Sequence, residues 1–477
     1  MTVSIPQPNT EPPLVLDFNW NTLFRGDRNN ASFNACVGHN GSPDIYYYAD
    51  GFAESVFILI KNIIDDKGTL DTLIYPICFS LRHSVELTLK GLIEDLADLA
   101  KLRKRTLSEK ISDVLTKHDI GNLWSYLENN ATNIDRRFRQ PLKQLAPRIK
   151  CIADTDPTGQ TFRYSYDTNS VKHLTDVSII NVLVLREQFE ILRDQLEALT
   201  SLVEYLREEY RTGTFTQNLN REDILAIAQK LPARETWSKP EVGLSAIKTS
   251  IKAEYNIGSK ELSEAFNFIQ STRDMARLIG LPTSVPGLSK VDFIKLNSIW
   301  KTAWSLEVLE DSLRDNIYRK TSSDKSCIPV NMMQELDLLE SARKKPSKSK
   351  KIFLQWATPE NMAGLSVLLD SRISYFSEDH DRIFGNRLKL MKSTKSSGQD
   401  TWETKIDDLW RRSVAKPFYP EIIVERLKGQ SFTEEASVVT TDLFHRSGYI
   451  KIIITIKSIL AKLASRIKTI FGGIKSS

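Results

Sequence analysis

Residues 182–210 read VLVLREQFEILRDQLEALTSLVEYLREEY, and this stretch decides the fold class. Its apolar side chains return at alternating steps of three and four, the period of one face of an α-helix. The positions are Val182, Leu185, Phe189, Leu192, Leu196, Leu199, Val203, Leu206 and Tyr210. Charged residues fill the other faces. The stretch predicts one long helix whose apolar seam either packs inside a helical bundle, which we favour, or joins two copies of the chain as a coiled coil.

Helical periodicity continues on both sides of this stretch. Upstream, apolar residues recur at helical spacing from Phe52 to Ile63 and again from Ile74 to Leu99, and Pro76 suits the first turn of the second helix. The sequence therefore predicts a mostly α-helical protein in which further helical domains follow the bundle. Its expected parts are an irregular N-terminal arm (1–50), a helical bundle (51–212), a second helical region (213–320), a basic Ser/Lys/Pro linker (321–351), a third helical region (352–448) and a basic amphipathic helix (449–477).

Length and composition limit the classes of protein that fit. A chain of 477 residues is longer than one hydrophobic core usually supports, so we expect more than one domain. A content of 41% hydrophobic and 26% charged residues is ordinary for globular domains. The net charge of +5 is too small to argue for nucleic-acid binding by itself. Four scattered cysteines indicate neither a disulfide framework nor a thiolate zinc site, and we expect a cytoplasmic protein without signal peptide or membrane span. Motifs for nucleotide hydrolysis, dinucleotide redox chemistry, zinc proteolysis and serine hydrolysis are absent from the sequence.

The sequence YPICFSLRHSVELTLKGLI (75–93) places charged side chains beside an apolar helix face. Arg82, Glu86 and Lys90 follow one another at steps of four and therefore stack on one face, with His83 on the next strip. Downstream stand HDIGNLW (118–124) and DPTGQTFRYSYD (156–167). Together these elements resemble the uncharacterised HEPN-like proteins of prokaryotes, over about residues 14–210. Ser165 stands where those proteins usually have proline.

The resemblance implies a helical bundle and, through the wider HEPN superfamily, a metal-independent ribonuclease or RNA-binding role in defence or growth arrest. In that superfamily an arginine and a histidine, separated by four to six residues, cleave RNA at a dimer interface. No arginine of this chain precedes a histidine at that spacing. The candidate residues come instead from the three elements that carry the resemblance. The candidate catalytic residues are Arg82, His83 and His118, and the candidate residues for binding RNA or another ligand are Glu86, Lys90, Arg163 and Tyr164.

A purely structural interpretation of the same residues stays open. Arg82, Glu86 and Lys90 can form an ion-pair network along the helix, with Arg163 and Asp167 tying the FRYSYD segment beside it. His118 can simply open a helix. The acidic cluster around His380 in RISYFSEDHDR (372–382) is typical of a polar helix end, and we expect neither a metal site nor a cofactor.

The C-terminal segment, residues 449–477, has one apolar and one cationic helical face. The apolar face includes Ile453, Ile456, Leu460, Leu463, Ile467 and Phe471, and the opposite face includes Lys457, Lys462 and Arg466, with no acidic residue in the segment. This pattern is typical of a helix that lies on an anionic membrane or binds a partner. Docking onto the protein's own C-terminal domain is the alternative.

Two hypotheses for function follow. The first is a HEPN-like defence or growth-arrest effector that binds RNA or a nucleotide and, if it is an enzyme, acts as a metal-independent ribonuclease. The second is a non-enzymatic stress or antiphage effector or scaffold that binds a partner and attaches peripherally to the inner membrane through its C-terminal helix. In either case we expect a homodimer through the 182–210 helix.

Overall fold

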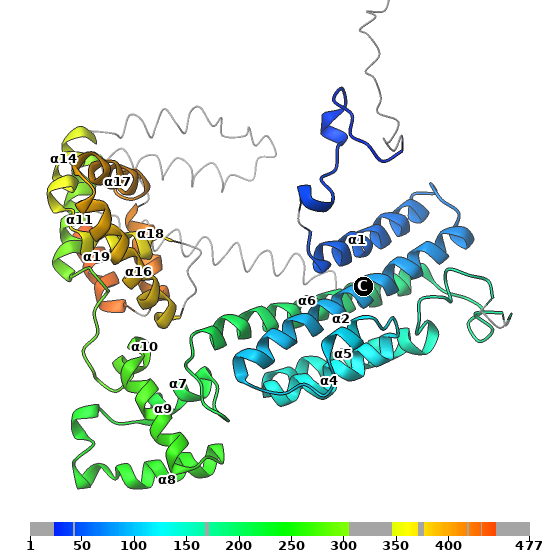
Figure 1. Cartoon of the computed structure of the whole chain (residues 1–477), viewed down its shortest axis with the longest axis horizontal. Coiled ribbons are helices and arrows are strands. Elements are labelled where there is room, and N and C mark those ends of the chain that lie inside the picture. Colours follow the sequence, from blue (N-terminus) through cyan, green and yellow to red (C-terminus); the bar gives the residue numbers. More distant parts are fainter. Residues whose placement is uncertain are drawn as a thin grey trace, which may run out of the picture. The chain divides into compact units, whose positions relative to one another are not determined.

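A computed structural model of the chain describes residues 23–41, 43–166, 170, 172–304, 346–370, 376–416, 419–430 and 432–444 (Figure 1). Within these ranges the chain is mostly helical and contains no β-strand, so the predicted all-α class is confirmed. The basic C-terminal helix expected over 449–477 lies outside the described residues, and so does most of the expected linker. The chain divides between Tyr205 and Leu206 into an N-terminal and a C-terminal unit.

The N-terminal unit is a helical bundle in which a long loop connects the last two helices. Its 3₁₀ turns are Ala31–Phe33, Gly38–Asn40 and Arg136–Phe138, and its helices are α1 (Ile45–Ile64), α2 (Leu70–Arg103), α3 (Ile111–Leu115), α4 (Ile120–Ile134), α5 (Arg139–Thr155) and most of α6 (Val182–Arg211). α2 packs against both α1 and α4, and α4 packs against α5 (Figure 1). Gly91 permits the contact of α2 with α1, because a Cβ there would lie 2.7 Å from the ring of Tyr46.

Two helices of this unit begin earlier than the sequence predicts. The side chain of Asp44 accepts the backbone N–H of Tyr47 and caps α1, so the expected arm ends six residues early. α2 begins at Leu70, which puts Pro76 at its seventh position instead of in its first turn. A proline so close to the start of a helix removes only one backbone hydrogen bond, and the 34-residue helix retains the rest.

The apolar seam of α6 is covered inside the chain itself. Val182, Phe189, Leu192, Leu196, Leu199 and Val203 are all buried. The ring of Phe189 stacks on Phe57 of α1 with 5.4 Å between the ring centroids. The interpretation of this seam as part of a bundle is therefore confirmed. Homodimerisation through α6 stays a prediction, and it would have to use the other faces of the helix.

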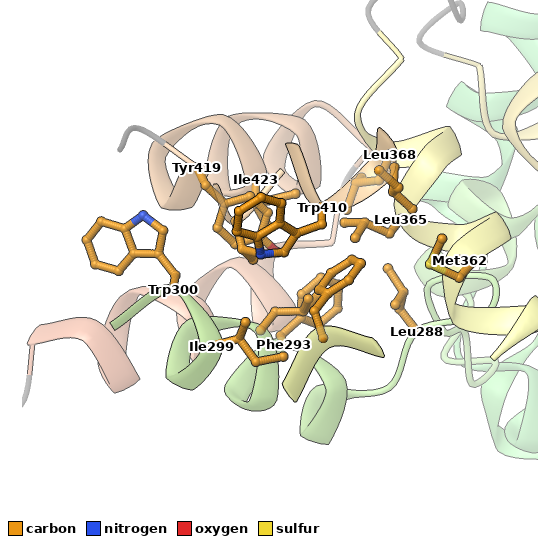
Figure 2. Close-up of a cluster of buried hydrophobic side chains, with 14 of the residues drawn as sticks. Leu288, Phe293, Ile299, Trp300, Met362, Leu365, Leu368, Trp410, Tyr419 and Ile423 are labelled. Atoms are coloured by element: carbon orange, nitrogen blue, oxygen red, sulfur yellow. The ribbon is translucent and has the colours of Figure 1, made fainter. Parts of the chain in front are cut away.

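The described helices of the C-terminal unit pack around two hydrophobic clusters. α7 (Arg221–Lys230), α8 (Leu244–Tyr255), α9 (Ser259–Ser271) and α10 (Arg273–Leu278) surround the first, with 3₁₀ turns at Arg234–Thr236 and Pro240–Val242. The second lies among α11 (Lys290–Ala303), α14 (Pro346–Trp356), α15 (Pro359–Leu368), α16 (Ser377–Ser396), α17 (Gln399–Arg412), α18 (Tyr419–Gly429) and α19 (Thr433–Phe444). Figure 2 shows part of this second core.

The course of α11 corrects the expected boundary between the second and third helical regions. The expected second region includes α11, yet Phe293 and Trp300 of this helix are buried in the core that α14–α19 build (Figure 2). The indole of Trp300 donates to the carbonyl of Lys416 at 3.0 Å, and that of Trp304 donates to the carbonyl of Val414 at 3.2 Å. The expected linker also ends early, because residues 346–351 form the first turns of α14 and Ser349 is buried there.

Candidate functional site

The candidate site is centred on the carboxylate of Glu86, near the middle of α2. Steps of four residues place Arg82, Glu86 and Lys90 on one face, as the sequence predicts. Arg82 Nη1 donates to Glu86 Oε2, and Lys90 Nζ lies 3.0 Å from Oε1. The side chains of Arg82 and Glu86 are only 3% and 4% exposed. The structure therefore contains the ion-pair network that the structural interpretation expected.

Arg82 joins three segments that are far apart in the sequence. Its Nε donates to the carbonyl of Asp156 at 3.1 Å, and its Nη2 donates to the carbonyls of His118 and Pro157. The Pro157 carbonyl also accepts the backbone N–H of Ile120 at 2.9 Å. The three segments that carry the HEPN-like resemblance thus meet at one buried guanidinium. A guanidinium that is buried and bonded in this way cannot touch a substrate, so we assign Arg82 a positioning role in place of the predicted catalytic one.

The loop after α5 is shaped to fit around this guanidinium. Asp156 is buried, and its Oδ1 accepts the backbone N–H groups of Gly159 at 2.9 Å and Thr161 at 3.1 Å. Gly159 has φ +80°, and a Cβ at this position would lie 3.1 Å from Arg82 Nη1. Glycine therefore supplies both the left-handed backbone and the space for the guanidinium. Burial, with a contribution from the nearby Asp156 charge, raises the pKa of the Cys78 thiol to about 12, which excludes a thiolate here at neutral pH.

Two imidazoles face the carboxylate of Glu86. His118 Nδ1 lies 2.8 Å from Oε1, and His83 Nδ1 lies 3.8 Å from Oε2. The side chain of His118 is 68% exposed and that of His83 is 29% exposed. A carboxylate bonded to Nδ1 favours the tautomer with the proton on that nitrogen, which leaves Nε2 as the basic nitrogen. His118 therefore has an oriented and solvent-accessible imidazole, although it precedes the α4 N-cap residue Asp119 instead of opening the helix.

The charge on Glu86 persists at neutral pH. Burial by itself raises the pKa of this carboxyl group, but the nearby imidazole of His83 and the bonds from Lys90, His118 and Arg82 outweigh burial and hold the pKa well below its ordinary value. A carboxylate that is ionised at neutral pH can hold the imidazole of His118 in one tautomer and one orientation. The pair thus has the parts of a general acid–base centre.

The aromatic surface beside His83 carries Arg163. The His83 ring stacks on Phe79 at 5.5 Å and meets the edge of Phe52 at 4.5 Å. The guanidinium of Arg163 lies 5.5 Å from the centre of the Phe79 ring and 5.3 Å from that of Tyr164. The structural interpretation placed Arg163 as a tie to the charged network, whereas the structure places it on these rings. Its proposed partner Asp167 lies outside the described residues.

The acidic cluster around His380 belongs to the C-terminal unit, and its carboxylates form ion pairs with arginines. Glu378 pairs with Arg221 at 2.9 Å, and Asp381 pairs with Arg273 at 3.2 Å. Asp379 pairs with Arg382, three residues along α16. In the described part of the chain no three histidine, cysteine or acidic residues come together as metal ligands. The segment is therefore the polar start of α16.

In the part of the chain that the structure describes, no helix combines the length and the apolar character that crossing a membrane requires.

Comparison with protein families, with curated proteins and with solved structures finds no match to this chain. The HEPN-like resemblance therefore stays a prediction from the three sequence elements. The convergence of these elements at Arg82 could not be predicted from their sequence, because the two downstream segments bind the guanidinium through backbone carbonyls, which every residue possesses.

Proposed function

We propose that the N-terminal unit binds RNA and cleaves it without a metal ion, with His118 as the general base. The observation that carries the proposal is the exposed imidazole of His118, whose Nδ1 lies 2.8 Å from a buried and ionised Glu86 carboxylate. An oriented imidazole at the surface is accessible to a polymeric substrate. The HEPN-like resemblance supports RNA as that substrate and a defence or growth-arrest effector as the biological role.

The reaction that suits this pair is an internal transesterification. His118 Nε2 takes the proton of a ribose 2′-hydroxyl, and the 2′-oxygen forms a bond to the adjacent phosphorus. The bond from phosphorus to the 5′-oxygen breaks, and the leaving oxygen receives a proton. The products are a 2′,3′-cyclic phosphate and a 5′-hydroxyl end, and no oxidant or co-reactant is consumed.

His83 is the proposed source of the second proton. It faces the other oxygen of the Glu86 carboxylate, so the two imidazoles lie on one acidic group. Glu86 balances the charge that moves between them, and Lys90 bonds to the same carboxylate. Arg82 acts through these residues, because it holds the backbone at His118 and the loop at Asp156 in place.

Incubation of the purified full-length protein with total RNA, with and without chelator, tests the proposal. We expect chelator-resistant cleavage by the wild-type protein and a loss of at least about 100-fold in the His118→Gln variant, the range in which general acid–base groups contribute. His83→Gln should also slow the reaction. His39→Gln is the matched control, because His39 is an exposed histidine on the Gly38–Asn40 turn, outside the site.

Three outcomes would contradict the proposal. The first is intact RNA after incubation with folded wild-type protein. Cleavage that the chelator abolishes would indicate a metal-dependent activity instead. Equal cleavage by wild-type protein and the His118→Gln variant would remove the assigned base. A melting curve for each variant separates loss of chemistry from loss of folding.

A further inference from the structure

A cavity of about 710 Å³ lies on the N-terminal unit, with Arg163 in its lining. The start of α2 forms one wall, and residues 161–165 with residues 172–180 form the other. The side chains that decide its chemistry are Tyr75, Arg163, Tyr164, Lys172 and His173, with Asp71 as its one acidic residue. The cavity is large enough for a nucleotide and carries both rings and cations.

The rings and the cation of this cavity are accessible. Tyr75 is 48% and Tyr164 is 53% exposed, which is a large fraction for aromatic side chains. Arg163 is an exposed residue, and its guanidinium lies against the rings of Phe79 and Tyr164. Exposed rings beside cations are the surface on which single-stranded nucleic acids bind, because bases stack on the rings and phosphates pair with the cations.

A second cavity of the same unit has a mostly acidic lining, in contrast to the first. It measures about 280 Å³, and its lining includes Asp44, Asp50, Glu197 and Glu204 against one arginine, Arg193. A wall with four carboxylates repels a phosphate backbone. Of these two cavities, only the one beside Arg163 suits an anionic ligand.

One strip of α2 connects the cavity to the proposed catalytic pair. Tyr75, Phe79 and His83 follow at steps of four on the same face, and Phe79 contacts both His83 and Arg163. Eight residues of helix span about 12 Å. That is the length of about three to four stacked nucleotides at ~3.4 Å each. A strand seated in the cavity would therefore reach Glu86 and its imidazoles within a few nucleotides.

We propose that this cavity binds a nucleotide of a single-stranded RNA segment, a few positions from the bond that is cleaved. Tyr164 stacks on the base, and Arg163 and Lys172 pair with the phosphates. The inference rests on the proposed function for the identity of the substrate, but binding can be measured without cleavage.

The test is fluorescence polarisation of a labelled single-stranded oligoribonucleotide with full-length protein in chelator. The His118→Gln background keeps the probe intact, and every affinity in the comparison is measured in this background. Adding Tyr164→Ala or Arg163→Ala should raise the Kd by about 5- to 100-fold, the range for loss of one stacking or cation contact. Tyr48→Ala and Arg186→Ala are matched controls and should stay within about twofold. Tyr48 is 52% exposed on α1, Arg186 is an exposed arginine of α6, and neither lines the cavity.

The outcomes separate the two proposals. Weakened binding in the cavity variants, with or without RNA cleavage by the wild-type protein, supports the cavity as the binding site. If cleavage needs His118 but Tyr164→Ala and Arg163→Ala leave the affinity for RNA unchanged, the proposal that the cavity binds RNA is wrong. The proposal that His118 is the catalytic base is then unaffected. Equal weakening in the cavity and control variants would also overturn the cavity proposal, because binding would then depend on general surface charge.

Discussion

Replacing Arg82 by alanine should destabilise the N-terminal unit more than any exposed ion-pair substitution. The change removes donors from one buried carboxylate and from three backbone carbonyls, those of His118, Asp156 and Pro157. Loss of one partner of a buried ion pair costs about 3–5 kcal/mol, because the remaining charge stays buried. For a unit of this size each kcal/mol lowers Tm by roughly 2–4 °C, so we expect a decrease of roughly 6–20 °C.

Calorimetry of the full-length protein measures this decrease, and hydrogen exchange locates it. Protection should fall in α2, at the start of α4 and in the loop after α5, which the guanidinium joins. Arg186→Ala is the matched control, because Arg186 pairs with Glu190 across the same four-residue step, at 2.9 Å, but both side chains are about half exposed. Such a pair contributes about 0.3–0.5 kcal/mol.

Equal stability losses in the two variants would refute the reasoning. They would mean that burial adds nothing to the Arg82 network. Arg82→Lys provides a second check, because an ammonium group cannot reach four acceptors in the geometry of a guanidinium. This variant should recover only part of the lost stability.

Three further predictions concern other parts of the chain. Gly159→Ala should cost about 1–3 kcal/mol and more than Gly213→Ala, because both glycines have φ near +80° but only the first Cβ would press on Arg82. Glu86→Gln should destabilise the protein at pH 7. Because folding lowers the pKa of Glu86, the difference in free energy of unfolding between wild-type protein and variant is full above about pH 4.3 and shrinks below it. Denaturation of both proteins at pH 7 and at pH 3.5 checks this. Arg221→Ala should destabilise the C-terminal unit by less than the ~3–5 kcal/mol of a fully buried pair, because Arg221 is buried but its partners Asp274 and Glu378 are only partly buried; hydrogen-exchange protection should stay unchanged in α2.

The sequence predicts the parts of this structure that depend on local spacing. The apolar period of α6 identifies both the helix and its buried face, because side chains three and four apart share a face. The same rule predicts the pairing of Arg82 and Lys90 with Glu86. In each case the partners are a turn or two apart, so no knowledge of the tertiary fold is required.

The remaining features depend on contacts between distant segments. His118 reaches Glu86 only because the start of α4 is tied to α2 and to the loop after α5. Arg163 was expected beside the charged network, but the ring of Phe79 holds it at the neighbouring cavity. α11 is held in the core of α14–α19 by Trp300 and by Trp304 at its C-cap, whose carbonyl partners lie more than 100 residues away.

The hypothesis of a non-enzymatic effector that attaches to membrane depends on residues 449–477, which lie outside the described residues. It stays a prediction. If wild-type protein leaves RNA intact, liposome binding by the full-length chain and by a variant without residues 449–477 becomes the next comparison.

The central claim is that His118, oriented by Glu86, activates a ribose 2′-hydroxyl. The most direct measurement compares two oligonucleotides of one sequence in chelator, one entirely RNA and one with a single 2′-deoxy substitution at the cleaved position. We predict that the RNA is cut to a 2′,3′-cyclic phosphate and a 5′-hydroxyl end, that the substituted strand resists at that position, and that His118→Gln cuts neither. Cleavage of the substituted strand at that position, or intact RNA with folded wild-type protein, would contradict the claim.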